Sequence, residues 1–297
     1  MSKPLRILIS GARGQLGTDC QAVLAGHVLL PLDLPNLDIT SPASLDGILD
    51  LWHPDVLVNC AAFTAVDRAE TARDAAFAVN RDGPALLADR AAKRSLFLVH
   101  VSTDYVFDGA RPLPQPYLES DPTDPQNVYG ASKLAGEQAV LAAAPANSAI
   151  LRTAWLYGAN GSNFLKTILR RARKFPDAPL RVVNDQFGSP TWSYTLARQI
   201  AAVLDARATG LFHASGEGVC TWFDFASEFL RLMQIPVAVV PCASSEFPSP
   251  TKRPTNSILE NAALKKLGLH LMRDWHDDLA DYVALHRNRL LAETAPD

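Results

Sequence analysis

Residues 5–17 read LRILISGARGQLG, and this stretch decides the fold. A short apolar run, Leu5–Ile9, leads into a Gly-x-x-Gly-x-x-Gly pattern at Gly11, Gly14 and Gly17, and a helical segment follows at residues 18–25. Glycines between a strand and a helix permit a tight turn and let backbone N–H groups approach a pyrophosphate. The stretch therefore predicts the first strand, loop and helix of a dinucleotide-binding unit. A glycine-rich turn without a ligand is the alternative.

The alternation of strand and helix repeats as far as about residue 155. Further apolar, strand-like runs occur at Val28–Leu32, Pro54–Asn59, Leu96–Val101 and Ala149–Thr153. The run at 54–59 is almost continuously apolar, which is typical of a strand buried on both faces of a parallel sheet. The alternation predicts an α/β fold, a Rossmann-type doubly wound parallel sheet with right-handed crossovers.

The composition changes after residue 158. We expect residues 1–158 to form the dinucleotide-binding Rossmann domain, and residues 159–297 to form a smaller, partly interleaved C-terminal substrate lobe. Segments at about 181–214 are expected to return to the Rossmann domain. Helical patterns cover residues 66–70, 75–90, 222–233 and about 274–291. Asn80 lies inside the second of these, where it bonds either backbone or a water, or else belongs to a solvated face.

The bulk properties exclude several classes of protein. The 297-residue chain is 48% hydrophobic and 20% charged, with a net charge of -3, so no nucleic-acid partner is expected. Its apolar runs fall short of the ~20 residues of a membrane span, and its N-terminus has the pattern of a strand, not of a signal peptide. The four cysteines are scattered and the histidines form no ligand-spaced cluster. We therefore expect reduced thiols, a cytoplasmic location and no metal site.

Two charged residues give opposite indications about the dinucleotide. Asp33 closes the second strand, where a carboxylate can bond a ribose hydroxyl; a turn aspartate is the alternative. Arg13, inside the glycine loop, could instead meet the extra phosphate of NADP. The residues leave NAD and NADP both open. Asp38 precedes the next helical segment and is either a helix-entry residue or an adenine contact.

Tyr129 and Lys133 are four residues apart in the stretch 123–140, and on the helix expected after the proline-rich loop 110–126 this spacing places both side chains on one face. The ammonium favours phenolate, so it is expected to lower a phenol pKa that starts near ~10. A tyrosine of this kind can transfer a proton near neutral pH. At the end of the fourth strand, Thr103 and Asp104 direct a hydroxyl and a carboxylate toward the ligand crevice; a capped turn is the alternative.

Seven motifs in order carry a family resemblance. They are GARGQLG, VNCAAFTAVDRAE, VSTDYVFDG, NVYGASKLAGE, LRTAWLYG, NDQFGSPT and RPTNS, within residues 11–257. Together they resemble the extended short-chain dehydrogenase/reductases, and among these the dTDP-4-dehydrorhamnose reductase family. The resemblance implies NAD(P)H-dependent reduction of the C4 keto group of dTDP-4-dehydro-β-L-rhamnose to dTDP-L-rhamnose, in the biosynthesis of nucleotide sugars for cell-surface polysaccharides.

The resemblance also implies roles for individual residues. Tyr129 would donate the proton, Lys133 would bond the nicotinamide ribose, and Thr103, ahead of its neighbour Ser102, would polarise the carbonyl. The positions that match cofactor contacts are Gly11, Gly14, Gln15, Leu16, Gly17, Asp33, Asp38, Ile39, Ala62, Phe63, Thr64 and Val101, besides Arg13. The positions that match substrate contacts are Thr103, Asp104, Trp155, Asn163, Phe187 and Arg253.

Several points stay open at this stage. NADPH is the expected cofactor, with NADH as the alternative. Some relatives bind magnesium at a dimer contact, and Asp19 is an acidic candidate without an identifiable set of partners. The chain is expected to be a monomer or a homodimer. The alternative functions are a reductase or epimerase of another nucleotide-linked sugar, or a regulatory subunit resembling that of methionine adenosyltransferase.

Overall fold

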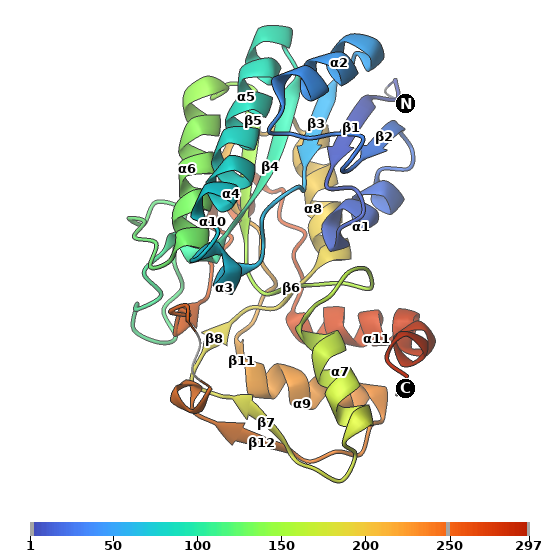
Figure 1. Cartoon of the computed structure of the whole chain (residues 1–297), viewed down its shortest axis with the longest axis vertical. Coiled ribbons are helices and arrows are strands. Elements are labelled where there is room, and N and C mark those ends of the chain that lie inside the picture. The colour runs from blue at the N-terminus through green and yellow to red at the C-terminus, as the bar shows by residue number, and fades with distance from the viewer. Residues whose placement is uncertain (1–2, 248–249, 296–297) are drawn as a thin grey trace.

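The computed structural model describes residues 3–247 and 250–295, and within them a parallel six-stranded sheet forms the centre of the molecule (Figure 1). The strand order is β10-β5-β4-β3-β1-β2, which confirms the predicted Rossmann-type sheet. The strands are β1 (Arg6–Ser10), β2 (Val28–Leu32), β3 (Val56–Asn59), β4 (Phe97–Thr103), β5 (Ser148–Thr153) and β10 (Gly210–His213).

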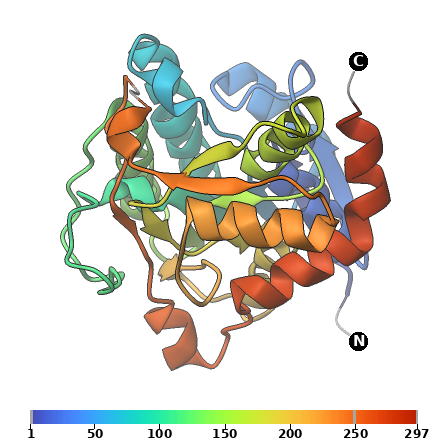
Figure 2. The same cartoon turned by 90° about the horizontal axis from the view of Figure 1, so that it is seen from below.

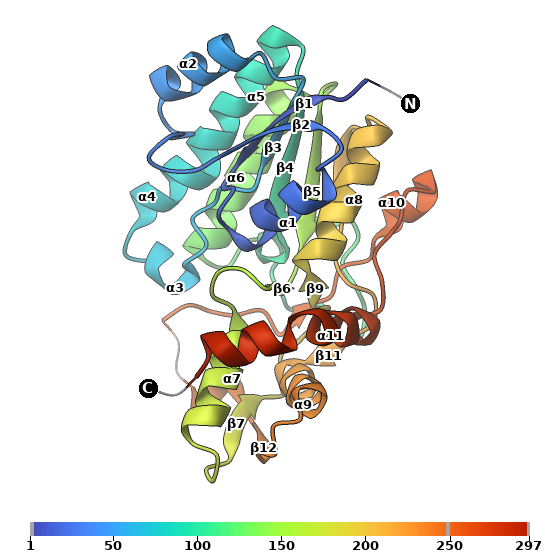
Figure 3. The same cartoon turned by 90° about the vertical axis from the view of Figure 1, so that its right-hand side faces the viewer.

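Helices cover both faces of this sheet, as Figure 3 shows. The reason is visible in β1, where Ile7 and Ile9 pack toward one helix layer while Leu8 packs toward the other. One layer contains α1 (Gln15–Val23) and α8 (Ser193–Asp205). The other contains α2 (Pro42–Trp52), α5 (Gly83–Arg94) and α6 (Val128–Ala143). A strand that is apolar on both sides can be buried only in such a three-layer arrangement.

The segment between β3 and α5 departs from the expected helix over residues 75–90. It consists of α3 (Val66–Ala69), α4 (Arg73–Phe77) and a π-helical turn, η1 (Ala78–Asp82), before α5 begins. The π turn holds Asn80, which is fully buried. Single π turns within helices are uncommon and often occur at functional sites, and periodicity alone does not reveal them.

The part of the chain below the sheet in Figure 1 forms a second hydrophobic cluster of its own. Its helices are α7 (Phe164–Lys174), α9 (Trp222–Met233) and α11 (Trp275–Glu293), and Figure 2 shows α9 in orange beside α11 in red. Its short strands are β6 (Leu156–Tyr157), β7 (Leu180–Val183), β8 (Phe187–Gly188), β9 (Thr191–Trp192), β11 (Cys220–Thr221), β12 (Val239–Cys242) and β13 (Asn256–Ser257). The remaining short helices are η2 (Asp104–Val106), η3 (Ser244–Glu246) and α10 (Ala262–Leu267). Among the described residues, none of the helices is long and apolar enough to cross a membrane.

Candidate active site

The glycine loop packs directly against the turn that follows β3. The strand order reverses between β1 and β3, and ligands of doubly wound sheets bind at such a point. Gly11 has a φ of +69°, and a Cβ atom placed there would lie 2.6 Å from the backbone nitrogen of Ala61. A Cβ at Gly17 would overlap the carbonyl oxygen of Gly11. The three glycines thus bring α1, which begins at Gln15, close to the crevice with its N-terminal N–H groups available to an anion.

Asp33 is held as a turn residue. Its Oδ2 accepts the backbone N–H of Arg13 at 3.1 Å and its Oδ1 accepts that of Leu34 at 2.9 Å. The Arg13 guanidinium is exposed beside the same turn and donates to the Leu34 carbonyl. Both carboxylate oxygens are thereby engaged with backbone, while the exposed cation lies at the end of β2 where the 2′ end of a dinucleotide ribose is expected.

Two of the expected cofactor residues belong to the hydrophobic core. The side chains of Leu16 and Ile39 are each 5% exposed and pack into the two clusters that flank the sheet. Only their backbone can face a cofactor. Asp38 accepts the backbone N–H of Thr40 at 2.9 Å and its hydroxyl at 2.7 Å. These bonds favour its interpretation as a residue of the helix entry.

Asn80 fixes the loop Ala62–Thr64 at the end of β3. Its Oδ1 accepts the Phe63 N–H at 2.8 Å, and its Nδ2 donates to the Phe63 carbonyl at 3.0 Å. The same Nδ2 donates to Ser132 Oγ at 3.0 Å, and this hydroxyl donates to the Tyr129 carbonyl at 2.7 Å. One buried amide therefore joins the loop after β3 to the helix α6 that carries Tyr129.

Tyr129 lies in the first turn of α6, with Thr103 at the end of β4 beside it. The Thr103 hydroxyl lies beside the phenol and donates to Asp104 Oδ1 at 2.9 Å. Tyr105 meets the Tyr129 ring edge-on, with the ring centroids 5.5 Å apart. Burial raises the pKa of Tyr129 to about 12. The predicted lowering of the Tyr129 pKa is therefore wrong, because the loss of water outweighs the effect of the neighbouring Thr103 hydroxyl and the Lys133 ammonium is directed to another group.

Lys133 lies one turn further along α6 and is 2% exposed. Its Nζ donates to the carbonyl oxygen of Val101 at 2.6 Å, next to the end of β4. Desolvation lowers the pKa of Lys133 to about 8, while Glu137 and Cys60 oppose this change. Glu137 is itself held by two hydrogen bonds to Arg152, at 2.9 and 2.7 Å. A buried lysine with such a pKa can gain or lose a proton near neutral pH.

Asp104 follows Thr103 at the start of η2 and is 5% exposed. Burial raises the pKa of this carboxyl to about 6, although the hydroxyls of Ser257 and Thr103 act to lower it. Ser257 belongs to β13 and therefore comes from the distant RPTNS motif. The structure thus brings the STDY and RPTNS motifs together around one carboxylate.

Trp155 follows β5, the strand next to β4, and forms an aromatic wall with Trp222 and Phe164. It adopts a left-handed backbone with a φ of +48°, and its indole stacks on Trp222 with the ring centroids 3.5 Å apart. The ring centroids of Phe164 and Trp222 are 4.6 Å apart. Gly188 leaves room for the Trp155 indole, because a Cβ atom at Gly188 would lie 2.5 Å from this ring. Trp222 and Phe164 were not predicted. Each is the first residue of its helix and directly follows the capping residue. This position is the local signal in the sequence that could have indicated them.

The other three expected substrate residues, Asn163, Phe187 and Arg253, do not form one cluster. Asn163 caps α7 and its Nδ2 donates to Gln15 Oε1 at 2.9 Å, so it links the lobe to the glycine loop. Phe187 lies half-buried in β8, paired with β11 and β13. Arg253 is exposed and forms an ion pair with Asp67 at 3.1 Å, which connects the loop before β13 to α3.

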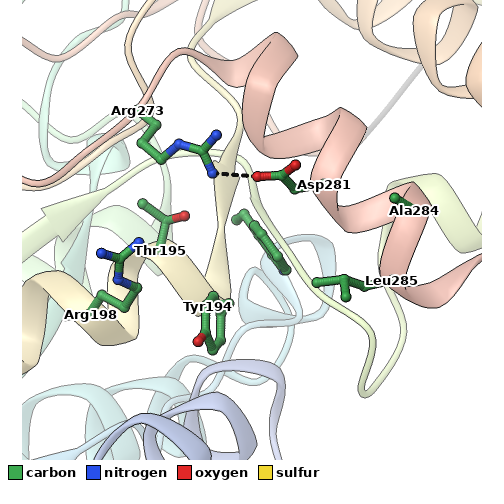
Figure 4. A pocket seen from close by; sticks show the side chains of 8 residues that line it. Tyr194, Thr195, Arg198, Arg273, Asp281, Ala284 and Leu285 are labelled. Carbon is green, nitrogen blue, oxygen red and sulfur yellow. Dashed lines mark hydrogen bonds and ion pairs between the residues drawn. The ribbon is translucent and has the colours of Figure 1, made fainter.

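Asp19 has a hydrogen-bond partner of its own. Its carboxylate accepts the Ser193 hydroxyl at the start of α8, and burial raises its pKa. Within residues 3–247 and 250–295, no group of three or more His, Cys, Asp or Glu residues could hold a metal ion. A separate hollow of about 300 Å³ lies between α8 and α11 (Figure 4). It is lined by Trp192, Tyr194, Thr195, Arg198, Arg273, Asp281, Ala284 and Leu285, which carry no role in the site described above.

The comparisons with known proteins agree with this arrangement. A family model described as the RmlD substrate binding domain matches residues 5–288. The chain belongs to this family. A relative from Mycobacterium tuberculosis named dTDP-4-dehydrorhamnose reductase is 43% identical, with 95% of this chain and 94% of the relative covered. A relative from Streptomyces niveus named dTDP-4-keto-6-deoxy-D-glucose reductase is 42% identical, with 91% and 93% covered.

A solved structure supports the same membership. It is dTDP-4-dehydrorhamnose reductase from Bacillus anthracis in complex with NADP, at 36% identity and a TM-score of 0.91. The match covers 95% of this chain and 100% of that chain. The resemblance predicted from seven motifs is thereby confirmed over nearly the whole length of the chain.

Proposed function

We propose that this protein reduces the C4 keto group of dTDP-4-dehydro-β-L-rhamnose to give dTDP-L-rhamnose, with NADPH as the reductant. It is an oxidoreductase of nucleotide-sugar biosynthesis. The observation that carries the proposal is the position of the Tyr129 phenol beside the Thr103 hydroxyl, with Lys133 one turn away, at the sheet edge that holds the glycine loop. Two relatives, matched over 94% and 100% of their own length, are named dTDP-4-dehydrorhamnose reductase.

The residues at the switch point fit a dinucleotide. Gly11 and Gly17 permit close backbone contacts that a Cβ would prevent, and α1 begins directly after this loop, so its N-terminal N–H groups can face a pyrophosphate. The exposed Arg13 would hold the 2′-phosphate, which favours NADPH over NADH, because Asp33 is already bonded to backbone. When bound, the nicotinamide supplies a hydride to the carbonyl carbon. The remaining proposed cofactor contacts are Gly14, Gln15, Leu16, Asp38, Ile39, Ala62, Phe63, Thr64 and Val101.

Tyr129 is proposed to donate the proton that the carbonyl oxygen requires. A phenol whose pKa is about 12 keeps its proton at neutral pH, which is the state a proton donor needs. Thr103 would polarise the same oxygen. Lys133, whose pKa is about 8, would bond the nicotinamide ribose and stabilise the phenolate that forms.

The aromatic wall is proposed to bind the nucleotide end of the substrate. Trp155, Trp222 and Phe164 present the flat apolar surfaces on which a base can stack. Asp104 would accept a sugar hydroxyl, and Arg253 would leave Asp67 to bond the diphosphate. Asn163 and Phe187 complete the proposed substrate contacts.

The organisation of the chain follows from these roles. We propose that residues 1–158 form the cofactor domain and residues 159–297 the substrate lobe, with the segments at about 181–214 shared between them. The protein is proposed to act in the cytoplasm, as a monomer or a homodimer, with no obligatory magnesium ion. Hydride transfer to a ketone needs an acid and positioning, so a Lewis acid is not required.

One coupled assay tests the proposal. The protein is mixed with NADPH or NADH and with the dTDP-linked 4-keto sugar, and absorbance of the reduced nicotinamide is followed. Oxidation is expected only when the keto sugar is present, and faster with NADPH. Absence of turnover with either nicotinamide would disprove the proposed reaction.

A second candidate is a reductase acting on another nucleotide-linked 4-keto sugar. The Streptomyces niveus relative, named for dTDP-4-keto-6-deoxy-D-glucose, favours this candidate. A panel that varies the base and the sugar separates the two by their kcat/KM ratios. A regulatory subunit of methionine adenosyltransferase is less well supported, because Tyr129, Lys133 and Thr103 are all present, with Thr103 beside the phenol and Lys133 one turn further along α6.

A further inference from the structure

One helical turn beyond Lys133, α6 carries a buried carboxylate that pairs with a buried guanidinium. Glu137 is 2% exposed, and Arg152 on β5 is 3% exposed. The Arg152 Nε donates to Glu137 Oε1 at 2.9 Å, and its Nη2 donates to Glu137 Oε2 at 2.7 Å. Both carboxylate oxygens are thus held by one planar donor, an arrangement that is strong and specific in direction. This double bond of donor to acceptor fixes where the Glu137 side chain points.

Lys133 is the other cation that Glu137 can reach. The two residues are four positions apart on α6, so their side chains are neighbours on one helix face, and both are buried. Glu137 nevertheless forms its ion pair with Arg152. The Lys133 Nζ donates instead to the Val101 carbonyl at 2.6 Å. An ammonium has three N–H donors, so this arrangement leaves the remaining donors of Lys133 to a ligand.

Burial determines what would follow if Arg152 were lost. A buried carboxylate without a partner is strongly destabilising, so Glu137 would turn to the adjacent cation, Lys133. A direct ion pair between them would withdraw the ammonium from the Val101 carbonyl. Burial lowers the pKa of Lys133 to about 8, and the charge of Glu137 opposes this change even across the present separation. A direct ion pair would therefore keep the Lys133 ammonium both charged and occupied.

We propose that Arg152 is a positioning residue that holds Glu137 away from Lys133, so that the Lys133 ammonium can bond the nicotinamide ribose. This inference rests on the role proposed above for Lys133. The surroundings of Arg152 support it, since Arg152 lies opposite Ser102 in the register of β4 and β5. Its guanidinium carbon also lies 5.0 Å from the centroid of the Phe107 ring. The central sheet and this ring hold the guanidinium, so they set the direction of Glu137 on α6.

The protonation of Lys133 tests this role of Arg152 without cofactor or substrate. In protein that contains ¹³C-labelled lysine, the NMR signal of each Cε follows the charge of its amine, and the signal missing from Lys133→Arg identifies Lys133. In Arg152→Met, the pH at which Lys133 is half protonated should rise by about one pH unit or more, because Glu137 then pairs with it. The double variant Arg152→Met, Glu137→Leu should return this pH toward that of the unaltered protein, because both charges are gone. An unchanged value in Arg152→Met would overturn the proposal.

The other ionisable groups on the elements around Lys133 are the same in all of these variants. They are Tyr129 on α6, Cys60 after β3, His100 on β4, Asp74 on α4 and Asp82 on η1. Burial holds the pKa of His100 well below its usual range, so this side chain is neutral at neutral pH. The two aspartates are exposed. A difference in the titration of Lys133 therefore reports on Glu137 and Arg152.

NADPH binding and turnover test the consequence for the proposed reaction. NADPH affinity, followed by nicotinamide fluorescence, and kcat should each fall by about 10–100-fold in Arg152→Met, which corresponds to the loss of one hydrogen bond from a charged group. The double variant should recover both to within about threefold of the unaltered protein, because apolar residues of similar volume often replace a buried ion pair without loss of stability. A double variant as impaired as Arg152→Met would assign Arg152 a merely structural role and overturn the proposal.

Arg90→Met is the matched control. Arg90 on α5 donates to both carboxylate oxygens of Asp46 on α2, at 2.7 and 2.8 Å, within the same helix layer. Its loss should leave NADPH affinity and kcat unchanged. If thermal melts show that Arg152→Met does not fold, Arg152→Gln takes its place, because its amide can still donate one hydrogen bond to Glu137. Absence of turnover in the unaltered protein would disprove the proposed function, while the NMR titration of Lys133 would still decide whether Arg152 holds Glu137 away.

Discussion

The cofactor edge of the sheet and the aromatic wall of the lobe are built in different ways. At the cofactor edge, backbone approaches backbone, and glycines at 11 and 17 permit contacts that any side chain would prevent. At the wall, Trp155, Trp222 and Phe164 come from three separate elements and meet only through their rings. A contact that requires glycine leaves a short motif in the sequence, whereas a contact between large side chains can be reached from many positions. The cofactor edge can therefore be predicted from the sequence, whereas the aromatic wall cannot.

The largest expected effect separates chemistry from binding. Tyr129→Phe removes the proposed proton donor, and kcat should fall by about 10²–10⁴-fold, the usual contribution of a positioned general acid. NADPH affinity should stay within about twofold, because the glycine loop is untouched. Stopped-flow turnover and nicotinamide fluorescence measure the two quantities, with Tyr194→Phe on α8 as the control. A variant with unaltered kcat would exclude Tyr129 from the acid role.

A methyl group in the glycine loop tests whether the cofactor edge depends on backbone contact. Gly11→Ala combines a left-handed backbone with overlap at Ala61, and should lower the free energy of unfolding by about 2 kcal/mol. NADPH affinity should fall by tenfold or more. Gly26→Ala is the matched control, since a Cβ there meets nothing within 4 Å. Equal behaviour of the two variants in thermal melts and binding would contradict this account of the loop.

Truncation of the wall should affect the substrate alone. Trp222→Ala removes the partner of Trp155, and KM for the nucleotide sugar should rise by roughly 10–100-fold, in line with about 1–3 kcal/mol for an aromatic–base stack. NADPH affinity should not change. Phe175→Ala, at an exposed position next to α7, is the control. A loss of kcat at unchanged KM would show that the wall positions the reacting carbonyl and does not bind the base.

The smallest expected effect concerns pH. Burial raises the pKa of two carboxyls, Asp104 at the start of η2 and Asp278 on α11, to about 6. A raised pKa means that the folded state binds the proton more tightly than the unfolded state. Stability is therefore lost as the pH rises from about 4 to about 6. Asp278→Asn should flatten this part of the profile by on the order of 1–2 kcal/mol in urea unfolding.

The control for this pH prediction is Asp281→Asn. Asp281 is exposed on the same helix and bonds the same arginine, Arg273, at 2.7 Å. The Asp281→Asn variant should have the same slope of stability against pH as the unaltered protein between pH 4 and 6. Identical slopes for the two variants would assign the pH dependence to the loss of charge on α11 and not to burial.

The sequence allowed the sheet, its strand positions and the Tyr129–Lys133 pair to be predicted, because each depends on residues near one another in the chain. It did not reveal the sign of the Tyr129 pKa shift, since desolvation depends on packing from Tyr105 and Thr103 on other elements. It did not distinguish the core side chains of Leu16 and Ile39 from cofactor contacts. The contact of Ser257 with Asp104 spans more than 150 positions, so no local pattern encodes it.

Asn80 has a consequence for stereochemistry. Reduction of the C4 ketone gives one of two epimers. Which epimer forms depends on which face of the carbonyl receives the hydride while Tyr129 and Thr103 hold the carbonyl oxygen. The Asn80 amide binds Phe63 in the loop after β3 and Ser132 in α6, so one residue sets the position of the loop relative to the phenol. Loss of these hydrogen bonds would let the loop after β3 and helix α6 move independently. We expect Asn80→Ala to yield a mixture of C4 epimers, a fault of fidelity that rate measurements alone would miss.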